Sequence, residues 1–261
     1  MSKNPLNKID ELKAKLADLR PLNQGEIRRL REEFIIENTY NTNAIEGNTL
    51  TLQETALILK EDITIAEKPL KMHLEAIGHR DAFEYMLTIA SPDDPLTERR
   101  IKELHSLVLM SDPINKGMYR SVPVMIMGAK NTPVLPYHIP PQMEVLLAGY
   151  ENIKRGKHII EAIAEFHLRF EGIHPFLDGN GRTGRLIMNL ELIKAGLLPV
   201  DIKYADRQKY YSCFDTYFGN ESSPDPLVRL IANYEVQEME RYIRIIEAKN
   251  ECNVIPLTSQ S

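Results

Sequence analysis

The sequence has no tryptophan, two cysteines in 261 residues and no long apolar run. Crossing a bilayer takes about 20 consecutive apolar residues, so we predict no membrane segment. The N-terminus also lacks the apolar stretch of a secretion signal. Cys213 and Cys252 are far apart, and Cys252 lies in a polar tail. This usage argues against a disulfide framework and predicts a cytoplasmic protein.

An excess of positive charge is also missing. The chain has 32 Lys and Arg against 37 Asp and Glu, a formal net charge of −5. A broad nucleic-acid surface needs clustered Lys and Arg in excess. Arg28, Arg29 and Arg31 form a basic cluster, but neighbouring glutamates dilute it, and we interpret it as a solvated helix face. We therefore predict no nucleic-acid partner.

Most of the chain has apolar residues at helical spacing. Thr51 and Glu54 have the capping-box spacing that starts a helix. Residues 122–135 differ, because they are apolar, partly β-branched and interrupted by prolines, which favours a short exposed β-hairpin at an edge. The prediction is an all-α fold with one hairpin. Its helices are expected at about 8–19, 24–45, from 51, 69–90, 97–110, 140–154, 157–172, 180–196, 204–218 and 226–248.

Residues 174–185, His-Pro-Phe-Leu-Asp-Gly-Asn-Gly-Arg-Thr-Gly-Arg, gather the groups that polyphosphate chemistry requires. Gly179 and Gly181 flank Asn180 just before an apolar helical stretch, so the turn lies at a helix N-terminus. Free N–H groups and the helix dipole favour an anion there, and glycines let phosphate approach the backbone. Arg182 and Arg185 are three residues apart on the first turn and suit two phosphates.

Two further side chains complete this run. Asp178 can hold Mg²⁺, which binds through one or two carboxylates together with phosphate oxygens. His174 lies four residues earlier, and its imidazole is suited to take a proton from an attacking hydroxyl.

Two common phosphate-binding motifs do not fit. Residues 179–184 match G-x-G-x-x-G, but the preceding residues 160–169 look helical rather than forming the strand of a dinucleotide-binding unit. A P-loop ends in Gly-Lys-Ser/Thr, whereas Arg185 follows Gly184 here. We reject both.

The same run resembles the signature of the Fic (Fido-domain) family, His-x-Phe-x-Asp/Glu-Gly-Asn-Gly-Arg-x-x-Arg, and every defining position is filled. The resemblance covers about residues 95–235. It implies a compact Fic fold, a helical bundle with a β-hairpin flap. It also implies a protein adenylyltransferase, which transfers AMP from ATP to a Ser, Thr or Tyr hydroxyl and releases pyrophosphate.

The resemblance assigns roles to the residues of the run. His174 is the base, Asp178 positions Mg²⁺, and Phe176 anchors the loop in the core. The hairpin would bind a target segment by strand addition. Tyr210 and Tyr211 match a paired aromatic near the nucleotide base, but Phe218 departs from an Asn found in several relatives. The predicted ATP-binding residues are Asp178, Gly179, Asn180, Gly181, Arg182, Thr183, Gly184, Arg185, Tyr210 and Tyr211.

A second segment resembles the inhibitory motif of this family, Ser/Thr-x-x-x-Glu-Gly/Asn. Thr42 and Glu46 are four apart and share a helix face, and Gly47 follows. Glu46 would pair with Arg185 and occupy the guanidinium that should bind the γ-phosphate. ATP could then bind only with its phosphates misplaced for in-line attack.

The predicted organisation is an N-terminal helical region with the inhibitory motif (1–94), a catalytic core (95–235) and a helix end with a tail (236–261). The leading function is an autoinhibited adenylyltransferase that modifies a target protein or itself. Two alternatives remain: removal of AMP from modified proteins with Glu46 orienting a water, and a nucleotide-binding sensor with vestigial catalysis. The sequence names neither the target nor the oligomeric state, and a homodimer is left open.

Overall fold

The protein is built from helices. A computed structural model describes residues 4–19, 22–126, 128, 130–219 and 221–252. Over these residues it has ten α-helices, two short 3-10 helices and no strand, so the all-α prediction is confirmed. In chain order the elements are α1 (Pro5–Asp18), α2 (Gln24–Ile45), α3 (Leu52–Glu61), α4 (Leu70–Thr88), α5 (Glu98–Val108), η1 (Pro136–His138), α6 (Ile139–Gly156), α7 (Ile159–Ile173), α8 (Asn180–Lys194), η2 (Tyr204–Asp206), α9 (Arg207–Phe218) and α10 (Asp225–Cys252).

Local signals in the sequence set the helix starts. Asn23 accepts a hydrogen bond from the Glu26 N–H at 3.0 Å, and the Glu26 carboxylate accepts one from the Asn23 N–H at 2.9 Å. Thr51 and Glu54 make the same reciprocal pair before α3, at 3.2 and 2.7 Å. Each capping box satisfies two backbone donors that a helix start leaves unpaired. The capping box predicted at Thr51 is confirmed.

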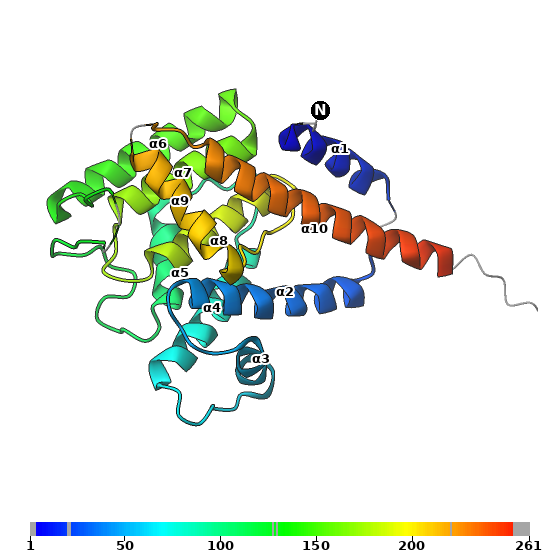
Figure 1. Cartoon of the computed structure of the whole chain (residues 1–261), viewed down its shortest axis with the longest axis horizontal. Coiled ribbons are helices and arrows are strands. Elements are labelled where there is room, and N and C mark those ends of the chain that lie inside the picture. Colours follow the sequence, from blue (N-terminus) through cyan, green and yellow to red (C-terminus); the bar gives the residue numbers. More distant parts are fainter. Residues whose placement is uncertain (1–3, 20–21, 127, 129, 220, 253–261) are drawn as a thin grey trace, which may run out of the picture.

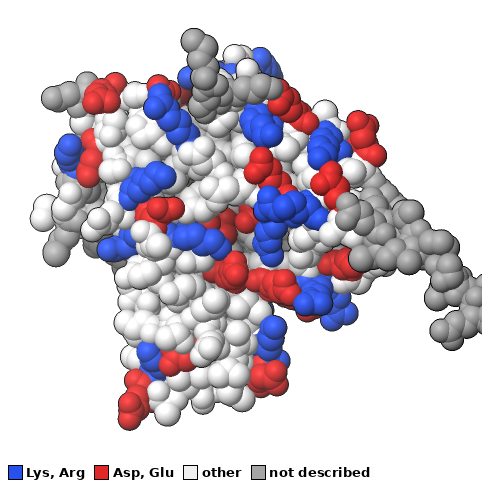
Figure 2. Space-filling model, turned by 45° about the vertical axis from the view of Figure 1, so that its right-hand side comes forward, with Lys and Arg blue, Asp and Glu red and all other residues white. Residues whose placement is uncertain are grey.

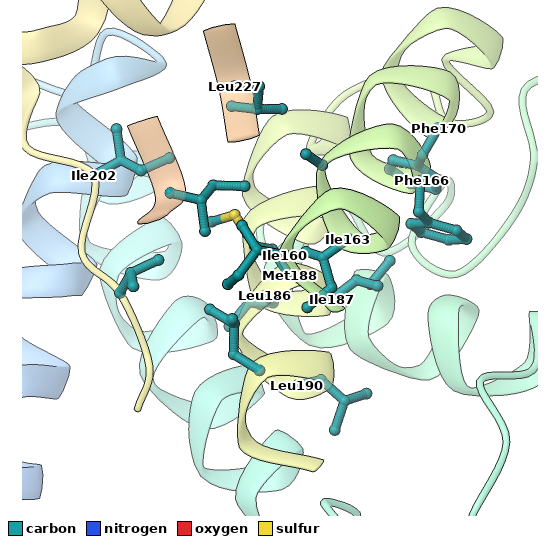
Figure 3. Packing of buried hydrophobic residues seen from close by; sticks show 14 of the residues in the cluster. Ile160, Ile163, Phe166, Phe170, Leu186, Ile187, Met188, Leu190, Ile202 and Leu227 are labelled. Atoms are coloured by element: carbon teal, nitrogen blue, oxygen red, sulfur yellow. The ribbon is translucent and has the colours of Figure 1, made fainter. Parts of the chain in front are cut away.

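The helices α7 and α8 lie at the centre of the molecule, with α8 also contacting α2, α4 and α5 (Figure 1). Ile160 and Ile163 of α7 pack against Leu186, Ile187 and Leu190 of α8 (Figure 3). Most residues of α8 are buried. Because tight packing on several sides fixes a helix in place, the N-terminus of α8 is held in a defined position.

One apolar core joins the three predicted regions. Ile9 of α1, Ile45 of α2 and Met239 of α10 belong to the same cluster as the residues of α7 and α8. The helix α1 packs along α10, and α10 runs without a break through the boundary at 235 (Figure 1). The division at 94 and 235 therefore crosses a continuous core. The tail residues 253–261 lie outside the described residues.

Charges of both signs alternate over much of the face in Figure 2, while the lower part, over α3 and the start of α4, carries few. Arg28 pairs with Glu32 at 2.8 Å and Arg29 with Glu33 at 3.0 Å, each one helical turn apart. These exposed pairs confirm the interpretation of the basic cluster as a solvated helix face. No helix in the described part of the chain has the length and apolar character needed to cross a membrane.

The segment predicted as a β-hairpin, residues 122–135, connects the region after α5 to η1. Its described residues form no strand, and Met127 and Ala129 lie outside the described residues. Pro123 and Pro133 lack the N–H group that a strand ladder uses. The hairpin stays a prediction.

A core substitution tests the packing of α8. Ile187→Ala should lower the free energy of unfolding by about 2–5 kcal/mol, because Ile187 is fully buried and the change leaves a cavity. Ile114 is 81% exposed, and Ile114→Ala should change it by less than about 0.5 kcal/mol. Urea unfolding followed by circular dichroism measures both. Similar values for the two variants would contradict the central position of α8.

Candidate active site

The site forms where α7 ends and α8 begins. His174 is the C-cap of α7 with φ 52°, and Gly179 precedes α8 with φ 79°, so both adopt the left-handed conformation. Glycine adopts it without strain, whereas histidine rarely does. The two reversals bring the imidazole and the free N–H groups of α8 to the same short loop. The predicted helix start at residue 180 is confirmed by α8, and the function of residues 174–185 as one site stays a prediction.

Asn180 closes the loop with its side chain. Its amide nitrogen donates to the Phe176 carbonyl and its amide oxygen accepts from the Phe176 N–H, both at 2.9 Å. Phe176 is fully buried, as predicted for a core anchor. Asn180 therefore holds the loop with its side chain, and only its backbone N–H is available for an anion.

His105 of α5 holds the same loop through a ring contact and a hydrogen bond. Its ring stacks on Phe176 with 3.6 Å between centroids, and its Nε2 lies 2.9 Å from the Asp178 carbonyl. Its Nδ1 accepts from the Gly117 N–H at 2.8 Å. A backbone N–H can only donate, so Nδ1 is unprotonated and Nε2–H donates to Asp178. Burial lowers the pKa of His105 to about 4, which keeps this tautomer neutral.

Arg120 ties the loop to both ends of segment 122–135. Its guanidinium donates to the carbonyls of His174 at 2.8 Å and Val122 at 3.0 Å, and also to that of Val134. Its own N–H donates to the Pro175 carbonyl at 3.0 Å. Arg120 is buried, and burial lowers its pKa. One side chain thus fixes the distance between His174 and the base of the predicted flap.

A cavity of about 430 Å³ opens above this loop. Its walls come from the end of α2, the segment 122–135, the α7–α8 junction and α9. Eight of the predicted ATP-site and catalytic residues line it together with Glu46. They are His174, Asp178, Gly179, Asn180, Gly181, Arg185, Tyr210 and Tyr211. Phe218, the residue that departs from the family pattern, lines it too.

Three predicted residues lie behind the cavity wall. Arg182 is almost fully buried and pairs with Asp178 at 3.2 Å and with Glu75 of α4 at 3.4 Å. Thr183 is fully buried inside α8. A Cβ at Gly184 would come within 2.8 Å of Glu171 and His167 on α7. In this structure Gly184 therefore permits close contact between α7 and α8.

Glu46 and Thr42 accept hydrogen bonds from the Arg185 guanidinium. The Arg185 guanidinium donates to Glu46 Oε1 at 2.7 Å, to Thr42 Oγ1 at 2.7 Å and to the Thr42 carbonyl at 3.0 Å. Burial opposes the charge of Arg185, but Tyr210 and Glu46 outweigh it and raise its pKa. A Cβ at Gly181 would lie 2.2 Å from Glu46 Oε1, so this glycine gives Glu46 its access. The predicted pairing of Glu46 with Arg185 agrees with this geometry.

Asp178 lies at the mouth of the cavity, with its side chain 48% exposed. Burial would raise its pKa, but Arg182, the Gly179 N–H and Lys71 outweigh that effect and lower it. No group of three or more His, Cys, Asp or Glu forms a metal cage in the described part of the chain. Mg²⁺ does not need such a cage, since one carboxylate and substrate phosphates suffice. A single ionised Asp178 fits that donor set.

His174 faces the cavity with its side chain 19% exposed. Burial lowers its pKa to about 4, with a further contribution from Arg120. The imidazole is therefore neutral at pH 7 and can accept a proton. Glu171, one turn earlier on α7, also lines the cavity, and burial and Glu46 raise its pKa to about 8.

Sequence reasoning missed Glu171, Glu75, His105 and Arg120. For Glu171 a signal existed, because it lies three residues before His174 and so shares its helix face. The other three reach the loop from elements far away in sequence, and nothing in their local sequence marks them.

Removing the Arg120 guanidinium should weaken the fold and loosen the segment that it anchors. Arg120→Met leaves the carbonyls of His174 and Val122 without this donor, so we expect a loss of about 3 kcal/mol in unfolding free energy. Amide hydrogen exchange in residues 122–135 should also accelerate. Arg99, which is exposed and pairs with Glu103 on its own helix, provides the control Arg99→Met. Equal stability of the two variants would contradict the anchoring role.

Comparison with known proteins gives one consistent family. Residues 95–192 match the Fic/DOC family. The chain is 34% identical over 244 residues to "Protein adenylyltransferase Fic" of Nematostella vectensis, covering 91% of this chain and 55% of that protein. The chain thus spans about half the length of the curated relatives it matches.

Solved structures give the same result. A Fic domain containing signaling protein from Bacteroides thetaiotaomicron has a TM-score of 0.83 and 27% identity, with 94% of this chain and 97% of that chain covered. Fic-1 from C. elegans has a TM-score of 0.82 and 29% identity, with 94% and 72% covered. Both similarities extend over the N-terminal helices as well as residues 95–192.

Proposed function

Because the chain belongs to the Fic/DOC family, as its sequence signature predicted, we propose that it is a protein adenylyltransferase. It would transfer AMP from ATP to a Ser, Thr or Tyr hydroxyl of a target protein, or of itself, and release pyrophosphate. The observation that carries the proposal is the neutral His174 facing the same cavity as Arg185 and the N-terminus of α8. The cavity thus joins a proton acceptor to a site for phosphates.

The chemistry follows from these groups. Nε2 of His174 takes the proton of the target hydroxyl while the oxygen of that hydroxyl attacks the α-phosphorus of ATP. The bond from the α-phosphorus to the bridging oxygen breaks, and pyrophosphate leaves with the negative charge. The N–H groups at the start of α8 and the guanidinium of Arg185 stabilise that charge. Arg182 would join them by exchanging Glu75 for a phosphate.

Asp178 would hold Mg²⁺, which neutralises charge on the bound phosphates. Its ionised, half-exposed carboxylate at the cavity mouth supports this assignment. In the structure Lys71 lies 3.5 Å from the same carboxylate, so a cation already balances its charge.

The base of the nucleotide would lie toward α9. Tyr211 lines the cavity, and its ring packs against Arg207 with 4.9 Å from the guanidinium carbon to the ring centroid. Tyr210 is fully buried, and its hydroxyl is hydrogen-bonded to Nε2 of His167 at 2.6 Å. Tyr210 therefore supports the cavity wall and Arg185. Phe218 offers an apolar face where several relatives have an amide. The preference for adenine rests on this apolar and aromatic wall.

Glu46 would act as a brake. Arg185 cannot hold the Glu46 carboxylate and a γ-phosphate at the same time, because both need the same N–H groups. Thr42 strengthens the brake by accepting from Nε of Arg185 at 2.7 Å. Removal of AMP from a modified target is the second candidate, because the Glu46 side chain is 33% exposed and shares the cavity with His174. In that reaction Glu46 would orient the attacking water.

The target would bind along segment 122–135 by strand addition, with Arg120 keeping that segment at a fixed distance from His174. A strand-like conformation of the segment belongs to this proposal. A cytoplasmic location and a homodimer stay predictions of the sequence.

Replacing the base should abolish transfer. His174→Ala should lower the rate of label incorporation from α-³²P-ATP by a factor of roughly 10² to 10⁴, because no other group takes the hydroxyl proton. His138, exposed on η1, provides the control His138→Ala, which should keep the wild-type rate. Unchanged labelling in His174→Ala would remove His174 from the mechanism.

Removing the brake should raise transfer. Glu46→Gly should increase self-modification or target modification roughly 100-fold, because Arg185 becomes free to align the γ-phosphate. Intact mass spectrometry with each nucleoside triphosphate then identifies the donor by the added mass. Glu61→Gly, also at a helix end but exposed, should have no effect. Equal labelling of wild type and Glu46→Gly would reject the brake.

The two candidate reactions separate in one further assay. An AMP-modified substrate, incubated without ATP, should keep its AMP if Glu46 only blocks Arg185. Release of AMP that requires Glu46 would instead support the second candidate.

A further inference from the structure

Glu171 is a buried carboxyl that the proposed chemistry does not yet use. It lies in the last turn of α7, its side chain is 13% exposed, and it lines the same cavity as His174. Its Oε1 is fully buried and makes no hydrogen bond among the described residues. A buried carboxyl without a partner is costly, so its retention calls for a reason beyond packing.

The nearest charged neighbour of Glu171 on its own helix is His174. Oε2 of Glu171 lies 3.8 Å from Nδ1 of His174. That Nδ1 is also buried and has no hydrogen bond of ordinary geometry among the described residues, although the backbone of Glu171 interacts with the imidazole and acts to raise its pKa. Oε2, the other oxygen of the same carboxyl, thus faces Nδ1 on the side of the imidazole opposite Nε2, while Oε1 lies toward Gly184. A movement of roughly 1 Å or less would bring Nδ1 of His174 and Oε2 of Glu171 into hydrogen-bond distance.

Every other element around Glu171 adds a titratable or charged group. Glu46 at the end of α2 raises its pKa and Arg185 on α8 lowers it, with burial as the largest cause and a net pKa of about 8. The phenol of Tyr210 on α9 interacts with Glu171, and the imidazole of His167 lies beside it near Gly184. Gly184 has no Cβ, which leaves the space that Oε1 fills.

We propose that Glu171 is a positioning residue for His174. Its carboxyl faces Nδ1, keeps the proton of the neutral imidazole on that nitrogen and stabilises the imidazolium that forms when Nε2 takes the hydroxyl proton. That proton leaves Nε2 for solvent after the transfer, and Nδ1 keeps its own proton throughout. The inference rests on the proposed function, because it assigns a helper to the base of that reaction.

The position of Glu46 connects this role to the brake. With Glu46 on Arg185, the Glu171 carboxyl is mostly protonated at pH 7 and offers His174 only a dipole. Burial is the largest cause of the raised pKa of Glu171 and Glu46 adds to it, so removing Glu46 lowers this pKa and increases the ionised share of the carboxyl beside the imidazolium. Glu46 therefore weakens the base as well as misplacing the phosphates.

The first test is a titration that needs no turnover. His174 is followed by nitrogen-15 NMR of the imidazole in the Glu46→Gly protein, and its resonances are assigned by comparison with a His174→Asn sample. Adding Glu171→Gln should lower the pKa of His174 and reduce the share of the Nδ1–H tautomer, because the charge beside Nδ1 is lost. Glu171→Asp should restore part of the shift. Unchanged pKa and tautomer in Glu171→Gln would overturn the proposal, whatever reaction the protein performs.

The second test is kinetic and uses the same background. Glu171→Gln should lower kcat about 10-fold or more and move the acid limb of the rate profile to lower pH, with KM for ATP unchanged. Glu165→Gln is the matched control, because Glu165 is on the same helix but pairs with Lys157 and Arg169 outside the cavity. It should change neither value.

The outcomes separate the two proposals. A shifted titration with no transfer activity in any variant supports Glu171 as positioning residue and counts against the proposed reaction. A lowered kcat with an unchanged titration and pH profile assigns Glu171 a merely structural role and overturns the inference. Thermal unfolding of each variant establishes that it is folded, and adding Glu171→Gln should keep the Tm of the Glu46→Gly protein because Gln has nearly the same size and shape as Glu.

Discussion

The site depends on the junction between α7 and α8. The chain must reverse there within a few residues, and it does so with a left-handed histidine at one end and a left-handed glycine at the other. Such a backbone persists only when its surroundings hold it. Asn180 closes the loop on Phe176, His105 holds the Asp178 carbonyl, and Arg120 holds the His174 carbonyl. The position of the imidazole relative to α8 is therefore set by hydrogen bonds from three directions.

Buried arginines impose the next constraint. Arg182 and Arg185 are almost fully enclosed by protein, and an unpaired charge there would cost several kcal/mol. Each finds a carboxylate from the N-terminal helices, Glu75 for Arg182 and Glu46 for Arg185. A bound triphosphate would supply equivalent partners. The N-terminal region that is proposed to inhibit the site thus also provides the carboxylates that pair with both buried arginines.

The sequence predicted those parts of the site that are local. The run 174–185 carries its own spacing, and Thr42 and Glu46 are four residues apart at the end of the helix predicted over 24–45. Distant partners could not be predicted in this way. His105 reaches its acceptor across 73 positions and Arg120 across 54, and only the packed helices bring them there. The hairpin predicted at 122–135 rests on its β-branched residues, and Pro123 and Pro133, which lack an N–H, restrict it to an edge position.

The placement of acid groups around the cavity gives a physical reason why the proposed brake would be a carboxylate rather than steric bulk. An apolar plug could block the nucleotide, but it would leave Arg185 unpaired. Glu46 satisfies the guanidinium and at the same time raises the pKa of Glu171, as a negative charge near a buried carboxyl must. A γ-phosphate on Arg185 would carry more negative charge than the Glu46 carboxylate, but Mg²⁺ on Asp178 would accompany it and offset part of that charge. The net field at Glu171 and His174 therefore depends on which anion Arg185 holds, and the base and the phosphate site respond to the same exchange.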